Sequence, residues 1–130
     1  MITNAEDDAR LAVQLQARTE SGLAVAVLGE VDMSNADELV QQMAQLLPTD
    51  GSSLVILDLG ELTFLGSAGV RALLDCRHIA EQRGMQLQIA IAHDNVRQVL
   101  TMCDLAEVLG LPAVPSPTVR SGGSDSRPSA

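Results

Sequence analysis

The spacing of apolar residues switches between two periods along this chain, which restricts the folds open to it. Four segments have strand character, either by strict alternation or as a short apolar run: residues 11–19, 23–29, 53–59 and 86–92. Helical spacing follows the second, third and fourth of these segments. The order β-β-α-β-α-β-α predicts one α/β domain with helices packed on a mixed sheet of four to five strands, opened by a β-hairpin.

Local signals mark the ends of these elements. Ser21-Gly22 forms the expected hairpin turn, and Ser34 is the expected N-cap of a helix that Pro48 ends. The next helix is expected from Ser67 to about Arg83, where Gly84 stops it, and Asp94 caps the last one. We therefore expect a domain over residues 11–112, between a flexible N-terminus (1–10) and a flexible tail (113–130).

Composition excludes several classes of partner. The chain has no Trp or Tyr and one aromatic residue, Phe64, which we interpret as a core anchor, so few rings are available to stack on bases. A net charge of -9 repels phosphate backbones and anionic membranes. The N-terminal residues MITNAEDDAR lack the order of basic and then apolar residues typical of a signal peptide, and no apolar run approaches the length needed to span a bilayer. We expect a cytoplasmic protein with no direct nucleic-acid contact and no membrane insertion.

The inventory of reactive side chains does not favour catalysis. The sequence contains no phosphate-binding loop and no dinucleotide fingerprint, and it lacks a Gly-x-Ser-x-Gly motif around Ser67. His78 and His93 stand without a cysteine or carboxylate at metal-ligand spacing, which is typical of surface histidines. We expect no enzyme activity, no cofactor and no metal site.

Two cysteines, Cys76 and Cys103, fit a reducing compartment. Both fall on the predicted core faces of their helices, so each is interpreted as a small buried hydrophobic residue. A redox pair remains the alternative if the two helices meet.

The segment from Leu65 to Val70 is the informative part of the chain. It follows a buried strand and opens a helix, so Ser67 lies where backbone N–H groups lack helical partners and the helix dipole is positive. A phosphate on its hydroxyl would be held by those N–H groups. Alternatively, Ser67 serves only as a helix cap.

Helical geometry places Val70, Leu74 and His78 on the face of Ser67, with Arg71 close beside them. Val70 and Leu74 would then form a small exposed apolar strip next to a modifiable serine, as suits a protein-binding surface. The alternative is that neighbouring loops cover both residues.

From about Leu11 to Leu111 the sequence resembles the STAS domain of anti-sigma-factor antagonists, small bacterial partner-switching proteins. The resemblance rests on GEVDMSNADEL (29–39), LVILDLGELTFLGSAGVRALL (54–74) and VRQVLTMCDLAEVL (96–109). The first two motifs at this separation are fairly specific. The family commonly has Asp-Ser-Ser-Gly at the turn where this chain has Gly66-Ser67-Ala68-Gly69. Members with glycine before the acceptor serine occur among actinobacteria.

The resemblance implies a function in transcription regulation during a stress response. Ser67 matches the serine that an anti-sigma factor with serine kinase activity phosphorylates, and Asp32 matches an acidic residue near the same surface. Unmodified, the chain would bind that kinase and free the sigma factor; phosphorylation would release it. The residues implied at the interface are Asp32, Gly66, Ala68, Val70, Arg71 and Leu74. We expect a monomer or weak dimer, without the further helix that often ends family members.

Two other functions compete with this interpretation. A STAS domain that is never phosphorylated could serve as an accessory or scaffold subunit of a transport or signalling complex. A small ligand-binding enzyme would need a pocket with converging polar groups. Because the sequence has few aromatic residues and few histidines, it gives little support for such a pocket.

Overall fold

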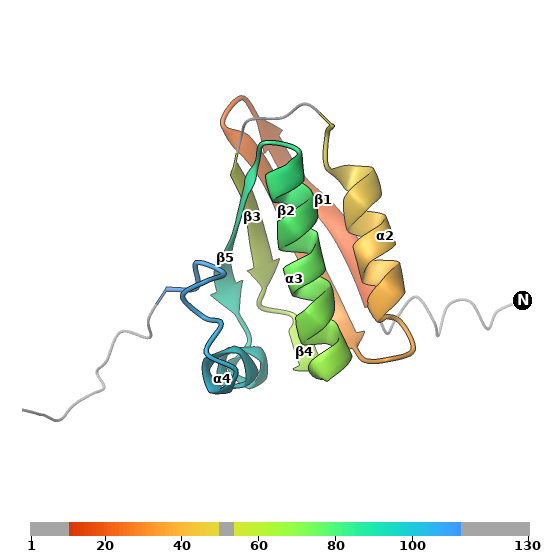
Figure 1. Cartoon of the computed structure of the whole chain (residues 1–130), viewed down its shortest axis with the longest axis vertical. Coiled ribbons are helices and arrows are strands. Elements are labelled where there is room, and N and C mark those ends of the chain that lie inside the picture. Colours follow the sequence, from red (N-terminus) through yellow and green to blue (C-terminus); the bar gives the residue numbers. More distant parts are fainter. Residues whose placement is uncertain (1–10, 50–53, 113–130) are drawn as a thin grey trace, which may run out of the picture.

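The fold is described from a computed structural model, which covers residues 11–49 and 54–112. The expected tails, 1–10 and 113–130, lie outside the described residues. The elements are, in chain order, β1 (Leu11–Thr19), β2 (Gly22–Val31), α2 (Ala36–Leu46), β3 (Leu54–Leu59), β4 (Leu62–Leu65), α3 (Ser67–Gln82), β5 (Gln86–Ala92) and α4 (Asp94–Met102) (Figure 1).

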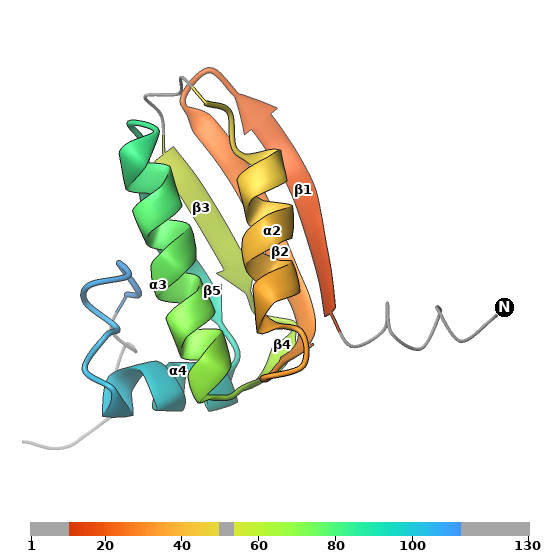
Figure 2. The same ribbon diagram turned by 45° about the vertical axis from the view of Figure 1, so that its right-hand side comes forward.

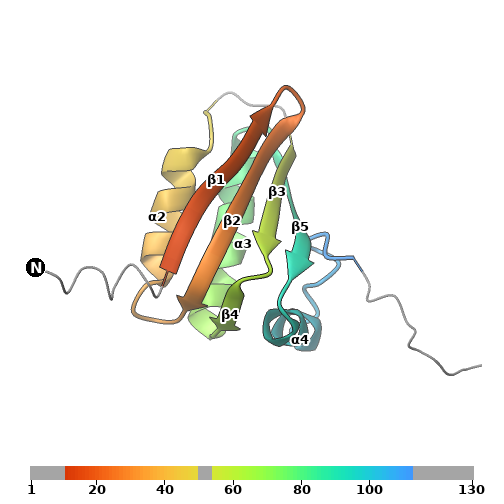
Figure 3. The same ribbon diagram turned by 180° about the vertical axis from the view of Figure 1, so that it is seen from behind.

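The sheet is mixed, as expected, and the described part of the chain gives it five strands. β1 pairs antiparallel with β2 to form the opening hairpin, and β2, β3 and β5 follow in parallel. The short β4 also runs parallel to β2, beyond the end of β3 (Figure 3). The carboxyl ends of β2 and β4 therefore lie together at one end of the sheet.

Two helices cover one face of this sheet. α2 and α3 run side by side over the strands, while α4 lies across the end of the sheet beside β4 (Figures 1 and 2). The alternating residues Leu23, Val25 and Val27 of β2 point into the layer between sheet and helices and are buried. The Nδ2 group of Asn95 in α4 donates to the Thr63 carbonyl at 3.1 Å, which fastens α4 to β4.

β4 was not predicted, because its residues were expected to form the connection between strand and helix. Four residues are too few to establish a period, and the strand exists through its pairing with β2. Leu87, Ile89 and Ile91 were predicted to share one face of β5, and this prediction is wrong for Ile91. A bulge shifts the register between Leu57 and Asp58, and Ile91 becomes 54% exposed.

Two predicted caps are also wrong. Asn35, not Ser34, is the N-cap of α2, and Ser34 instead donates from its hydroxyl to Asp32 Oδ1 at 2.6 Å. His93, not Asp94, is the N-cap of α4, where its Nδ1 accepts from the Asn95 amide at 3.1 Å. The ends of α3 follow the prediction, with Gly84 beyond its C-terminus at φ +81°.

No helix in the described ranges is long and apolar enough to cross a membrane.

Candidate functional site: the surface around Ser67

Ser67 is the first residue of α3, and its side chain is exposed. The alternative interpretation, in which its hydroxyl caps the helix, is wrong. Gly66 occupies the N-cap position, with φ −83° and ψ −178°, and the helix has no side-chain cap hydrogen bond. Ser67 therefore presents its hydroxyl at the surface without serving as the cap of its own helix.

Two close contacts hold the start of α3 against the end of β2. The Gly66 amide donates to the Val31 carbonyl at 3.0 Å. Gly69 is buried so tightly that a Cβ built on it would stand 3.0 Å from Val31 Cγ1 and 2.6 Å from Leu65 Cδ1. A side chain at position 69 would force Leu65 or Val31 to shift, so the first turn of α3 fits closely against the end of β2 and this fit helps to position Ser67.

The loop between β2 and α2 lies beside this turn and is internally braced. Asp32 Oδ1 accepts from the Ser34 amide at 2.9 Å, an Asx-type turn. The buried Asn35 side chain accepts from the Asp32 amide and donates to the Glu30 carbonyl, both at 2.9 Å. Asp32 directly follows Val31, whose carbonyl accepts from the Gly66 amide, and part of its carboxylate shapes the loop.

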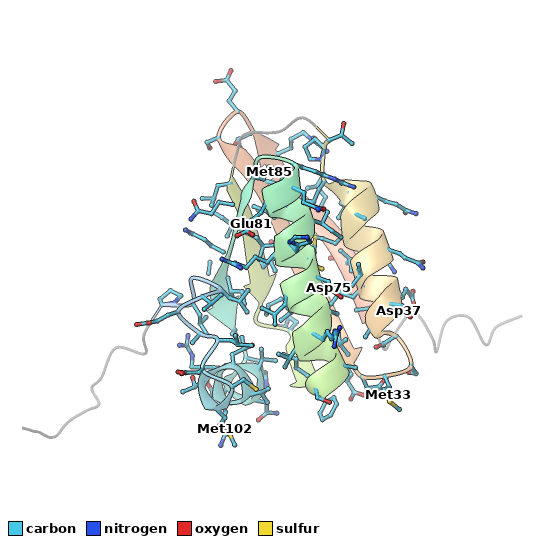
Figure 4. The ribbon with its side chains drawn as sticks, in the orientation of Figure 1. Met33, Asp37, Asp75, Glu81, Met85 and Met102 are labelled. Atoms are coloured by element: carbon cyan, nitrogen blue, oxygen red, sulfur yellow. The ribbon has the colours of Figure 1, made fainter. Side chains whose placement is uncertain are left out.

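A groove separates α2 from α3 and opens next to Ser67. It is lined by Met33, Ala36, Asp37, Val40, Ala68, Arg71, Ala72 and Asp75. Figure 4 places Asp75 on the side of α3 that faces α2, with Asp37 and Met33 at the start of α2. The groove brings together two of the predicted interface residues, Ala68 and Arg71, with the residue after Asp32.

Val70 and Leu74 do not form the exposed apolar strip that was predicted for them. Val70 is only 7% exposed, because it belongs to the core below the first turn of α3, and Leu74 is half-buried against that core. Phe64, expected in the core, is 49% exposed and its ring lies against Gly66. Met33 is 88% exposed. Among the described residues, exposed apolar side chains near the Ser67 turn include Phe64, which lies against Gly66, and Met33, which lines the same groove as Ala68.

Sequence periodicity missed Phe64 and Met33 for different reasons. Phe64 belongs to the unpredicted strand β4. Met33 lies in a loop, where no period applies, although its place directly after Asp32 was a usable signal.

The two cysteines lie in different environments. Cys76 is fully buried in α3, and burial, with a smaller effect from the Asp75 carboxylate, raises the pKa of its thiol to about 12. Cys103 is exposed, so its predicted burial is wrong: it follows the last residue of α4 and lies outside the helix. Both thiols are free, and the proposed redox pair is absent from the structure.

Groups of three or more His, Cys, Asp or Glu side chains that could hold a metal ion were not found among the described residues.

The STAS-domain family profile matches residues 12–121, most of the chain, and the chain belongs to the STAS-domain family. Two solved structures share this fold. An anti-sigma factor antagonist from Mycobacterium paratuberculosis superposes with a TM-score of 0.64 at 20% identity, covering 80% of this chain and 86% of that one. The anti-sigma factor antagonist SpoIIAA in its unphosphorylated form superposes with a TM-score of 0.61 at 20% identity, covering 81% and 90%.

Proposed function

We propose that the protein is a non-enzymatic anti-sigma-factor antagonist that acts by partner switching. With Ser67 unmodified, it would bind an anti-sigma factor that is also a serine kinase, so that the sigma factor is released. The observation that carries this proposal is an exposed serine at the first residue of α3, beside the groove between α2 and α3. Two proteins of similar structure are anti-sigma factor antagonists, one of them solved in its unphosphorylated form, and this supports the proposal.

The binding surface would combine one polar and one apolar part. Asp32, Gly66, Ala68, Arg71 and Leu74 are interface residues predicted from the sequence, Asp32 by the family resemblance and Arg71 and Leu74 by their place near Ser67 on the helix. Val70, which was included with them, is buried and would act from below by supporting the turn. The exposed side chains of Met33 and Phe64 would supply apolar area next to Ser67.

Phosphorylation would end this interaction. The kinase would transfer the γ-phosphoryl group of ATP to Ser67 Oγ; the hydroxyl proton is lost and ADP leaves. The phosphate adds about 1.5 to 2 negative charges at neutral pH to a surface built for the unmodified serine. Each loss of about 1.4 kcal/mol in binding free energy lowers affinity tenfold, so a poorly neutralised phosphate can abolish the complex.

The test is to incubate the protein with ATP and candidate anti-sigma kinases, and to map the phosphorylated residue by mass spectrometry. We expect phosphate on Ser67 alone and none on a Ser67→Ala variant. Phosphate at another residue would contradict the mechanism. Stable binding without any phosphorylation would instead favour the second function, a permanent accessory or scaffold subunit.

A further inference from the structure

Arg71 lies one helical turn after Ser67, and both side chains are exposed on α3. Residues at positions i and i+4 of a helix are neighbours on its surface. The Cα–Cβ bonds of a helix tilt toward its N-terminus, so a long side chain covers the turn that precedes it. The guanidinium group of Arg71 therefore reaches toward Ser67 more readily than toward the following turn.

The neighbouring carboxylates do not hold Arg71. Within the described residues no ion pair joins Arg71 to Asp75, which follows it at i+4, or to Asp37 across the groove. A helical ion pair stabilises the helix less when the base precedes the acid by four residues than when the acid precedes the base. A phosphate at position 67 and Arg71 would stand in this stronger order.

We propose that Arg71 is the intramolecular partner of a phosphate carried on Ser67. The planar guanidinium donates two parallel N–H groups to phosphate oxygens, which a lysine in its place could not match. The inference rests on the proposed function in taking Ser67 as the modified residue.

The pairing has a consequence for the groove between α2 and α3. Arg71 is the only basic residue among those that line it, together with the acidic residues Asp37 and Asp75. When the phosphate draws the guanidinium toward Ser67, the groove keeps two carboxylates and loses its cation. Phosphorylation thereby changes the partner-binding surface twice, by adding negative charge at Ser67 and by withdrawing positive charge from the groove.

The experiment installs phosphoserine at position 67 of the full chain during translation, so it needs no kinase. The second ionisation of the phosphate, with a pKa near 6 when free, is followed by ³¹P NMR as pH is varied. A nearby cation favours the dianion, so we expect this pKa to be lower in the native protein than in Arg71→Gln, by about 0.15 to 0.4 unit, which is the energy of an i,i+4 helix pair converted at about 1.4 kcal/mol per pKa unit. Raising NaCl to about 1 M should remove most of the difference.

The matched control is Arg77→Gln. Arg77 lies on the same helix but pairs with Glu81 at 3.1 Å, more than two turns from Ser67, and its loss should leave the phosphate pKa unchanged. Equal pKa values in the native protein and Arg71→Gln, or equal shifts in both variants, would overturn the proposal. If Arg71→Gln does not fold, an unchanged phosphate pKa in the native protein between low and high salt overturns it. Because the phosphate is installed directly, failure of the Arg71–phosphate pairing is distinguishable from absence of a kinase.

Discussion

Gly66 directly precedes Ser67 and Gly69 follows two residues after it, and the two glycines differ in how much space surrounds them. Gly69 is required by space, since a Cβ there would stand 3.0 Å from the buried Val31 side chain. Gly66 has an ordinary φ of −83°, and a Cβ there would meet the ring of Phe64 at 3.4 Å, a normal contact. A side chain at position 66 can therefore be added without displacing a neighbour, whereas one at position 69 forces Leu65 or Val31 to shift.

Gly69→Ala should lower the free energy of unfolding by about 1 kcal/mol, measured by urea denaturation. Overpacking a tight site costs about 1 to 3 kcal/mol, and the better helix propensity of alanine returns up to about 1 kcal/mol. The free energy of unfolding should fall without a change in its urea dependence. An alanine variant as stable as the native protein would show that Leu65 and Val31 accommodate the added methyl group without cost.

Gly66→Asp should raise the free energy of unfolding by a few tenths of a kcal/mol to about 1 kcal/mol. Aspartate is a better N-cap than glycine, and its charge suits the positive end of the helix dipole. The same denaturation experiment measures the change, and Gly66→Asn separates the hydrogen bond from the charge. Loss of stability in both variants would contradict the N-cap position of Gly66.

Cys76 should control stability at alkaline pH. The chain has no Tyr, and its eight basic residues are all arginine, so no lysine or tyrosine side chain titrates there. The pKa of the Cys76 thiol is raised from its ordinary 9.0 to about 12, so between these values the unfolded chain binds fewer protons than the folded one. The free energy of unfolding should therefore fall as pH rises through this window, by up to about 1.4 kcal/mol per pH unit.

Urea denaturation between pH 8 and 11 measures this slope. Cys76→Ala should be less stable at pH 8 but should lose the slope above pH 9, whereas Cys103→Ser should keep it because Cys103 is exposed. An equal alkaline slope in the native protein and Cys76→Ala would assign it to another group.

At the scale of elements, α3 positions α2 as well as Ser67. Arg83, just beyond the end of α3, donates from Nη1 to the carbonyls of Ala44 and Leu47 at 2.7 and 2.9 Å. Ala44 lies in the last turn of α2 and Leu47 is its C-cap, where carbonyls lack helical partners and the dipole is negative. The far ends of both helices are thereby fixed to one another, opposite the end where the groove meets Ser67.

Arg83→Met, which keeps much of the side-chain length, should lower the free energy of unfolding by about 1.5 to 3 kcal/mol, because half-buried carbonyls lose a charged donor. Arg77→Met is the control. Its exposed pair with Glu81 is worth no more than about 0.5 kcal/mol. Thermal denaturation compares the two, and equal losses would contradict the capping role of Arg83.

For the whole molecule, the strongly periodic elements could be predicted from the sequence, because strand alternation and helical spacing each persist over several residues. What could not be predicted depends on pairing between distant segments. β4 exists only beside β2, and the bulge opposite Asp58 reverses the face of Ile91. The side of α3 that faces solvent was misplaced at Val70, because a helical wheel carries no reference direction until the helix is docked on the sheet.

Cys76 belongs to the single hydrophobic core, so the reactivity of its thiol reports on unfolding of the whole domain. Its fully buried thiol should react with an alkylating reagent only when the domain unfolds, while the exposed Cys103 should react at once. Mass spectrometry during alkylation should show one fast label and one slow label, with the slow rate following global stability as urea is added. Two fast labels would mean that α3 opens locally.

Partner switching makes a direct prediction about the ratio of two dissociation constants. The anti-sigma kinase that phosphorylates this chain is titrated calorimetrically, with a non-hydrolysable ATP analogue, against the unmodified protein and against the protein carrying phosphoserine at position 67. We predict at least a tenfold weaker complex with the phosphorylated form, a loss of about 1.4 kcal/mol or more. Equal affinity of the kinase for both forms would contradict the account.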